Sequence, residues 1–270
     1  ALARQLHENG LREVSGDLVG DDTAYIWDPY PPGWAESDVR REYGAAVSAL
    51  TFNDNSIRLL LLANEETGEP EIRFDPAVDY YSVSNRMLTQ PGSGRPHIVG
   101  VGQPRELILG GGMDVPARLS VAVDDPALFA AFAFRQVLAE EGIAVRGVAR
   151  ARHRLSTLEP LLAPAGPTLA TRQSPPLIQI LQTVNKASQN LHAELLLQEV
   201  GRMAEGHGTR AAGFRRLAEF LTALGIGPDE IRFSDGSGLS RLDLVTPRAV
   251  TGLLAAMWNS PHRQAWLETL

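Results

Sequence analysis

The chain has 270 residues, 44% of them hydrophobic, and a net charge of −7 at pH 7. This length and apolar content suffice for one large or two medium globular domains. No basic cluster is long enough to form the positive face of a nucleic-acid binder, and the absence of cysteine excludes disulfides, thiolate zinc sites and cysteine nucleophiles. No apolar run reaches the about 18 residues that a membrane-spanning helix needs.

Both ends of the sequence predict a piece of a longer protein. The chain begins at Ala1 with neither an initiator Met nor a signal peptide, and a helical pattern still runs through residues 266–270. The missing targeting segment therefore says nothing about where the parent protein lives.

Up to about residue 154 the pattern favours strands. Asn53-Asp54-Asn55 is a turn signal, and residues 65–70 have a loop composition. One helix is expected over residues 127–141, opened by Asp125-Pro126 and stopped by Gly142. Four arginines between 146 and 154 are interpreted as the exposed side of a strand. The expected strands are 14–19, 47–52, 57–63, 71–74, 80–83, 98–101, 105–109, 117–123 and 143–149.

After a linker rich in proline and alanine, residues 161–168, the pattern becomes helical. Ser174 is expected to cap a first helix with Pro175 at its first position, because proline loses no hydrogen bond there. Further helices are expected from Leu191, over 209–224 with Gly225 as its cap, and from Thr246-Pro247 until Ser260-Pro261. The last of these is predicted to bury four apolar side chains: Val250, Leu253, Leu254 and Met257.

Several generic motifs fail. The glycines at 110–112 lack the following Lys-Ser/Thr of a phosphate loop, and Gly100 and Gly102 lack the third glycine of a dinucleotide site. His192 and Glu194 echo the deaminase His-x-Glu, but no cysteine ligands exist. The histidines show no His-x-x-x-His spacing, so no metal site is expected and His192 is interpreted as a partly buried helix residue.

A Ser-x-Asn string, Ser188 and Asn190, stands at a predicted junction between two helices. A hydroxyl and an amide two residues apart could both point into one cleft, with Lys186 close enough to favour a proton-relay role. The other interpretation is that Ser188 and Asn190 simply cap the next helix. Spacing alone leaves both open.

A second string, Ser-Asp-Gly-Ser-Gly-Leu-Ser-Arg at 234–241, precedes Thr246-Pro247. By itself it predicts a glycine-rich turn that leads to a capped helix.

Taken together, these segments resemble the class C penicillin-binding proteins, the D-Ala-D-Ala carboxypeptidases of the penicillin-binding protein 4 type. The resemblance rests on Asn-Lys-x-Ser-x-Asn at 185–190, Ala-Glu at 193–194, and the strings at 235–241 and 246–247, in that order. It extends upstream over nearly the whole chain, at 16–18 with Asp21, 32–34, 43–45, 48–50, 53–55 and 125–127.

This resemblance implies an α+β multidomain fold. Residues 1–165 would form inserted β-rich domains, with a nested module near 57–112, and 166–270 the helical portion of a penicillin-recognising serine hydrolase domain. Ser188 would relay a proton to the leaving amine, Asn190 would hydrogen-bond the acyl-side amide of the substrate, and Lys186 would support the site electrostatically. Three further candidates for substrate binding lie in the second string: Asp235, Ser237 and Arg241.

The implied activity is that of a serine D-Ala-D-Ala carboxypeptidase, with endopeptidase activity left open, acting on peptidoglycan stem peptides outside the cytoplasmic membrane. It implies binding of β-lactams by the parent and no metal or organic cofactor. The family's Ser-x-x-Lys and Lys-Thr-Gly motifs each need a lysine. Lys186 is the only lysine here and fits neither, because Thr183 stands three residues before it. We therefore expect this chain alone to be inactive.

Two other functions stay open. The chain could be a non-catalytic peptidoglycan- or protein-binding module that keeps the scaffold. It could also be an unrelated hydrolase, which would need Ser188 and His192 within hydrogen-bond reach.

Overall fold

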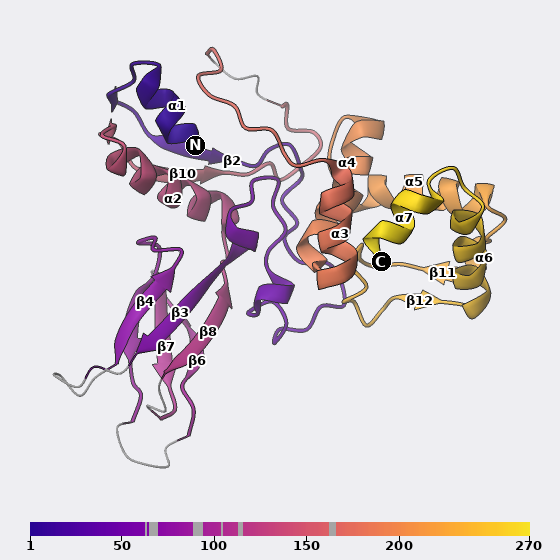
Figure 1. Ribbon diagram of the computed structural model, residues 1–270, viewed down its shortest axis with the longest axis horizontal. Coiled ribbons are helices and arrows are strands. Elements are labelled where there is room, and N and C mark those ends of the chain that lie inside the picture. The colour runs from indigo at the N-terminus through magenta and orange to yellow at the C-terminus, as the bar shows by residue number, and fades with distance from the viewer. Residues whose placement is uncertain (63, 65–69, 89–93, 104, 113–115, 162–165) are drawn as a thin grey trace.

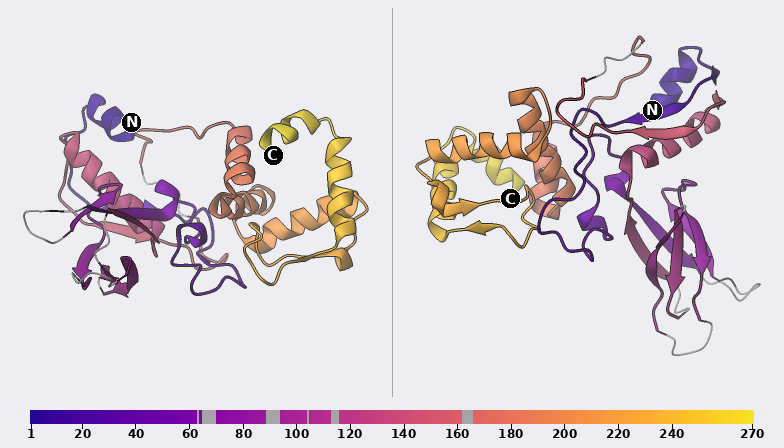
Figure 2. Two further views of the ribbon diagram at one scale, coloured as in Figure 1. Left: turned by 60° about the horizontal axis from the view of Figure 1, so that its bottom comes forward. Right: turned by 180° about the vertical axis from the view of Figure 1, so that it is seen from behind.

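The computed structural model describes residues 1–62, 64, 70–88, 94–103, 105–112, 116–161 and 166–270. A strand-rich part, which also contains one long and one short α-helix, lies beside a helical part (Figures 1 and 2). This arrangement confirms the expected α+β fold. The domain boundary near residue 165 stays a prediction, and part of the expected linker lies outside the described residues.

One layer of the strand-rich part is built from its first and its last elements in the sequence. Helix α2 packs on two short parallel pairs, β1 with β9 and β10 with β2. Its own small core contains Ala3, Leu6, Leu138 and Ile143. The elements are α1 (Leu2–Glu8), β1 (Glu13–Val14), β2 (Leu18–Asp21), α2 (Pro126–Glu140), β9 (Ala144–Val145) and β10 (Ala149–Arg152).

The single strands expected over 14–19 and 143–149 are wrong, because each is two short strands. The breaks fall where Gly16 and Gly147 meet: a Cβ on Gly147 would lie 2.4 Å from the carbonyl oxygen of Gly16. There the Asp17 carboxylate accepts the N–H of Val148 at 3.0 Å, in place of a backbone acceptor. A side chain of the neighbouring segment, 131 residues away in the sequence, thus takes the place of one rung of the ladder.

Two three-stranded sheets enclose the largest core (Figure 1). One sheet has the order β4-β3-β8 and the other β5-β7-β6. Alternate residues of β3 point inward, so that Ile57, Leu59 and Leu61 are buried against Leu107 and Phe129. The strands are β3 (Ser56–Leu62), β4 (Glu71–Asp75), β5 (Ser82–Asn85), β6 (His97–Gly102), β7 (Glu106–Gly110) and β8 (Ala117–Ala122).

The strand expected over 47–52 is wrong. The segment from β2 to β3 contains only the 3₁₀ turns η1 (Glu42–Gly44) and η2 (Asn53–Asn55). Its backbone bonds go to other loops: Val47 N–H donates to the Pro29 carbonyl at 2.9 Å, and the Asn55 amide donates to the Ala46 carbonyl at 2.8 Å. The apolar alternation did not produce a strand, because no strand of the described chain lies beside this segment to pair with it.

The arginines near β10 mostly confirm the expected exposed strand face. Three of them form exposed ion pairs with acids of the adjoining segment, whereas Arg154 is buried and donates to the carbonyls of Thr157 and Glu159. The exposed pairs are Arg146–Glu13, Arg150–Asp17 and Arg152–Asp21.

The helical part contains five helices and one two-stranded antiparallel pair in the described residues. Thr209 and Thr246 cap their helices by accepting the N–H of Ala212 and Ala249, as expected. The elements are α3 (Leu177–Ala187), α4 (Asn190–Glu205), α5 (Arg210–Ala223), η3 (Pro228–Glu230), β11 (Ile231–Arg232), β12 (Leu244–Val245), α6 (Pro247–Trp258) and α7 (Arg263–Thr269).

The expected start of α3 is wrong, since the helix begins at Leu177 and Ser174 does not cap it. Each proline of the pair 175–176 disfavours helical geometry at the residue before it, and Pro176 itself is extended with ψ 144°.

The apolar faces of α3 and α6 are largely open. Val250 and Leu254 are 41% and 47% exposed, so the burial expected for them is wrong, and only Ala249 of α6 is buried. Helix α3 has no buried residue at all. Within the described ranges, every helix is too short or too polar to cross a membrane.

Candidate active site

The Ser-x-Asn string lies at the tight connection between α3 and α4. Ser188 ends α3 in the left-handed region, with φ 53° and ψ 50°, a conformation that costs a residue with a side chain about 1 kcal/mol or more. The cap of α4 is Gln189, whose side chain accepts the N–H of Leu191 at 3.2 Å. Capping by Ser188 or Asn190 is therefore wrong, and Ser188 and Lys186 are left exposed.

Two loops of the strand-rich part hold this connection. Asn190 donates its amide to the carbonyl of Tyr43 at 2.9 Å. Asp54 accepts from Gln189 at 3.2 Å and lies 2.9 Å from Nε2 of His192. This bond from His192 lowers the pKa of Asp54.

Asp54 reaches α4 because its turn is left-handed. Asn53, Asp54 and Asn55 all have φ between 50° and 53°, which suits Asn and Asp better than most residues. Their turn signal was predicted correctly, but its contact with α4 spans more than 130 residues and left no mark in the sequence.

A Ser188–His192 hydrolase is not supported. His192 is partly buried, as expected, and Asp54 supplies a carboxylate to its Nε2. Its Nδ1 is buried with no hydrogen-bond partner, and across the described ranges Ser188 forms no hydrogen bond to it.

The loop at 234–241 is organised around Asp235, which is only 2% exposed. Burial by itself would raise the pKa of Asp235, but hydrogen bonds, that of Trp34 foremost, hold it below its usual value. The carboxylate accepts from five donors: Nε1 of Trp34 at 2.7 Å, N and Oγ of Ser237 at 3.1 and 2.9 Å, N of Gly238 at 2.6 Å and N of Ser240 at 2.7 Å.

The same loop binds the segment that carries Trp34. Ser240 donates its hydroxyl to the Pro32 carbonyl at 2.7 Å, and Arg241 donates to Asp38 at 3.0 Å. Gly33 is required where the two meet, since it has φ 88° and a Cβ there would lie 2.2 Å from Oγ of Ser240. Two strings about 200 residues apart therefore form one structural unit.

Glu194 joins this unit to the Ser-x-Asn helix. Its side chain is fully buried in α4, and one carboxylate oxygen accepts the N–H of Gly236 at 2.5 Å. The other oxygen has no hydrogen-bond partner in the described chain. Burial raises the pKa of Glu194 to about 7. No site role was predicted for Glu194 from the sequence. A signal was available, because this acid falls on the same face of α4 as Leu191, Gln198 and Gly201, which are buried.

The structure thus places the predicted site residues in two different settings, the connection between α3 and α4 and the loop at 234–241, which Glu194 of α4 joins. Lys186 and Ser188 end α3 and Asn190 begins α4, and a ligand can reach the exposed Ser188. Asp235 and Ser237 bond to one another inside the loop, which favours a structural role for them. Arg241 keeps most of its side chain exposed. Binding of substrate by these last three stays a prediction.

Sequence comparison places these features in a known group. The family model described as the D-Ala-D-Ala carboxypeptidase 3 (S13) family matches residues 1–270. A D-alanyl-D-alanine carboxypeptidase from an Actinomadura species is 30% identical over 282 residues, covering all of this chain and 51% of that protein. D-alanyl-D-alanine carboxypeptidase DacB from Haemophilus influenzae is 25% identical, with 56% of its length covered. The chain spans about half the length of these relatives.

Two solved structures share the fold. Penicillin binding protein 4 (dacB) from Haemophilus influenzae superposes with a TM-score of 0.80 at 22% identity, over 99% of this chain and 59% of that one. The same protein complexed with a β-lactam gives 0.72 at 23% identity, over 99% and 57%.

Proposed function

This chain belongs to the D-Ala-D-Ala carboxypeptidase 3 family, and we propose that it contributes the second active-site motif of a serine D-Ala-D-Ala carboxypeptidase. The proposed substrates are peptidoglycan stem peptides, cleaved through an acyl-enzyme that β-lactams also form, outside the cytoplasmic membrane. The same site would also support endopeptidase activity on these peptides. No metal or cofactor takes part.

The observation that carries this proposal is the geometry of Ser188 and Asn190. A strained left-handed residue presents the Ser188 hydroxyl at the surface, where it can pass a proton to the departing amine. Asn190 donates its N–H₂ group to the carbonyl of Tyr43, which fixes the amide. Its oxygen accepts no hydrogen bond from the described residues and can accept the N–H of a substrate peptide bond. The Lys186 ammonium nearby would favour negative charge that develops during the reaction.

We place the nucleophile outside these 270 residues, since their single lysine is in neither Ser-x-x-Lys nor Lys-Thr-Gly. The open apolar faces of α3 and α6 would then be covered by the rest of the catalytic domain, because exposed apolar patches of this kind usually mark contact surfaces. The described chain alone should neither hydrolyse peptides nor react with penicillin.

The test uses the product of the complete gene. Ser188→Ala and Asn190→Ala should each lower kcat/KM for a peptide ending in D-Ala-D-Ala by about 100-fold or more, as expected for loss of a proton-transfer or positioning group. Thr183→Ala, which removes another exposed hydroxyl of α3, is the matched control and should change little. Unchanged activity in both site variants would refute the assignment.

Intact-mass analysis of this chain after incubation with penicillin tests where the nucleophile lies. No adduct is expected. A stoichiometric adduct would place the attacking serine inside these residues and would overturn the role given to Ser188. A complete gene without Ser-x-x-Lys would instead favour the non-catalytic wall-binding module.

A further inference from the structure

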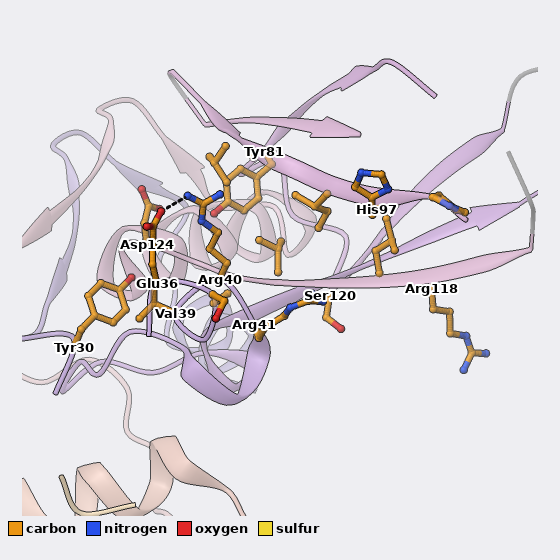
Figure 3. Close-up of a pocket in the computed structure, with 18 residues that line it drawn as sticks. Tyr30, Glu36, Val39, Arg40, Arg41, Tyr81, His97, Arg118, Ser120 and Asp124 are labelled. Carbon is orange, nitrogen blue, oxygen red and sulfur yellow. Dashed lines mark hydrogen bonds and ion pairs between the residues drawn. The ribbon is translucent and has the colours of Figure 1, made fainter. Parts of the chain in front are cut away.

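A cleft of about 740 Å³ separates the edges of the two three-stranded sheets (Figure 3). β6 forms one wall and β8 the other, and each is the last strand of its sheet in the described part of the chain. The residues 36–41 close one end, where Figure 3 shows Arg40 turned toward Glu36, while Arg118 stands at the opposite end.

The backbone of β8 presents to this cleft hydrogen-bonding groups that no residue in the described part of the chain uses. Val123 N–H donates toward the β3 side, to the carbonyl of Asn55 at 2.9 Å, whereas Ala122 N–H donates the other way, to the carbonyl of Arg40 at 3.2 Å. Because successive residues of an antiparallel strand point to opposite neighbours, Ser120 and Arg118 must also face outward. Arg40 therefore supplies the first rung on an edge that, among the described residues, has no backbone partner beyond it.

Most of the charged side chains that line the cleft without an ion-pair partner in the described chain are arginines. Arg41 and Arg118 have no ion-pair partner among the residues that the structure describes, and His97 lies on the opposite wall. Of the two acids that line the cleft, Glu36 pairs with Arg40 at 2.8 Å, whereas Asp124 accepts from the hydroxyl of Tyr80 at 3.0 Å, a neutral donor that offsets no charge. Three arginines therefore line the cleft with two carboxylates. In a protein of net charge −7, this local excess of arginine favours an anionic ligand.

Apolar side chains line the cleft between these charges, from both walls: Ile98 and Val101 on β6 and Leu119 on β8. A strand laid along the β8 edge would turn alternate side chains toward them and the others toward solvent. Arg118 and Ala122 are four residues apart, which is about 13 Å along an extended strand. Two side chains of a docked strand that lie four residues apart would span the same length.

We propose that this cleft docks an extended acidic segment of a partner protein, which adds to the edge of β8 as a further strand. Its amides would bond the outward groups of Ser120 and Arg118, continuing the ladder that Arg40 begins. Its carboxylates, about four residues apart, would face Arg41 and Arg118. A polypeptide fits this edge better than a glycan, because only a polypeptide repeats N–H and C=O groups at strand spacing.

The test measures binding of a fluorescent nonapeptide of alternating valine and threonine with glutamate at its third and seventh positions. Arg41→Glu and Arg118→Glu should each weaken binding at least fivefold. Arg86→Glu, an exposed arginine that does not line the cleft, should stay within twofold of the parent chain. Ser120→Pro should weaken binding at least tenfold, because it removes an outward N–H that β3 does not use.

A peptide with N-methylated amides on one edge controls for backbone pairing without altering the protein, and should bind at least tenfold more weakly. Equal binding of this peptide, or no saturable binding of the parent peptide, would overturn the proposal. Tighter binding of peptide-free glycan strands would assign the cleft to the wall instead, and self-association lost in Arg118→Glu would assign it to a second copy. None of these readouts depends on peptidase activity.

Discussion

Glu194 is the residue whose charge state should most affect stability. Its buried carboxylate has one oxygen bonded to Gly236 and the other without a partner in the described chain. Because its pKa in the folded chain, about 7, lies above the ordinary value of 4.5, folding favours the protonated form. The stability that this contributes is fully present below pH 4.5 and is lost as the pH rises through about 7, at a cost of about 3 kcal/mol.

Glu194→Gln should remove this loss, since glutamine keeps the shape and an acceptor for Gly236 without a charge. The variant should match the parent chain near pH 4 and exceed its free energy of unfolding by up to about 3 kcal/mol at pH 8. Urea unfolding at both pH values measures the difference. Glu199→Gln, at a carboxylate whose pKa is lowered by Arg202, is the control and should not gain stability at pH 8. Parallel pH profiles for parent and Glu194→Gln would contradict the buried charge.

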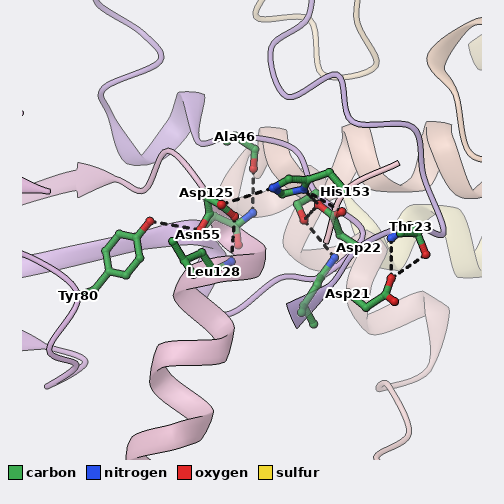
Figure 4. A network of polar contacts seen from close by, with 11 residues as sticks. Asp21, Asp22, Thr23, Ala46, Asn55, Tyr80, Asp125, Leu128 and His153 are labelled. Carbon is green, nitrogen blue, oxygen red and sulfur yellow. Dashed lines mark hydrogen bonds and ion pairs between the residues drawn. The ribbon is translucent and has the colours of Figure 1, made fainter. Parts of the chain in front are cut away.

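At the scale of elements, His153 joins three of them. It follows β10, and its Nδ1 lies 3.0 Å from both carboxylate oxygens of Asp22, which follows β2 (Figure 4). Its Nε2 lies 3.4 Å from Asp125, the cap of α2, and its ring stacks on Trp27 at 4.1 Å. Asp22 is buried, and burial raises its pKa. Its negative charge is therefore stabilised mainly by its hydrogen-bond donors, His153 and Ser48.

His153→Ala should therefore lower the free energy of unfolding by about 2–4 kcal/mol, because among the described residues Asp22 then keeps only the Ser48 hydroxyl as a side-chain donor. Adding Asp22→Asn should recover part of the loss, since the neutral amide needs less compensation. Chemical unfolding of the two single variants and the double variant measures this coupling. His262→Ala, at an exposed histidine, should change stability by less than about 0.5 kcal/mol. Additive effects at His153 and Asp22 would show that the two do not act as a pair.

The sequence predicted an element well where the residues that determine it are neighbours along the chain. Asp125, Thr209 and Thr246 each cap a helix within three residues, so the sequence alone located those starts. The strand at 47–52 failed because pairing needs a neighbour that no local pattern reveals. Of the site, Ser188 and Asn190 were found by their spacing and resemblance, but the contacts of Asp54 and Glu194 depend on how distant segments pack.

At the scale of the whole molecule, polar contacts fasten the strand-rich part to the helices. Buried Arg210 donates to Asp28, and the hydroxyl of Tyr25 donates to Glu199 at 3.1 Å. Trp34 donates to Asp235 at 2.7 Å. The sequence contained both strings of this last contact, yet with 201 residues between the two partners nothing in it predicted that they touch.

Asp235→Asn should loosen this junction, because asparagine offers one acceptor oxygen and turns two N–H donors toward backbone N–H groups. We expect a loss of about 2–4 kcal/mol in the free energy of unfolding, against about 1 kcal/mol for Trp34→Phe, which removes a single donor. Urea unfolding measures both, and limited proteolysis shows whether cleavage near residues 166–176 becomes faster. Ser237→Ala removes one side-chain donor and should resemble Trp34→Phe. If Asp235→Asn instead proved as stable as the parent chain, the carboxylate would not organise the loop, and binding of substrate by Asp235 would become the better explanation for its place beside the Ser-x-Asn helix.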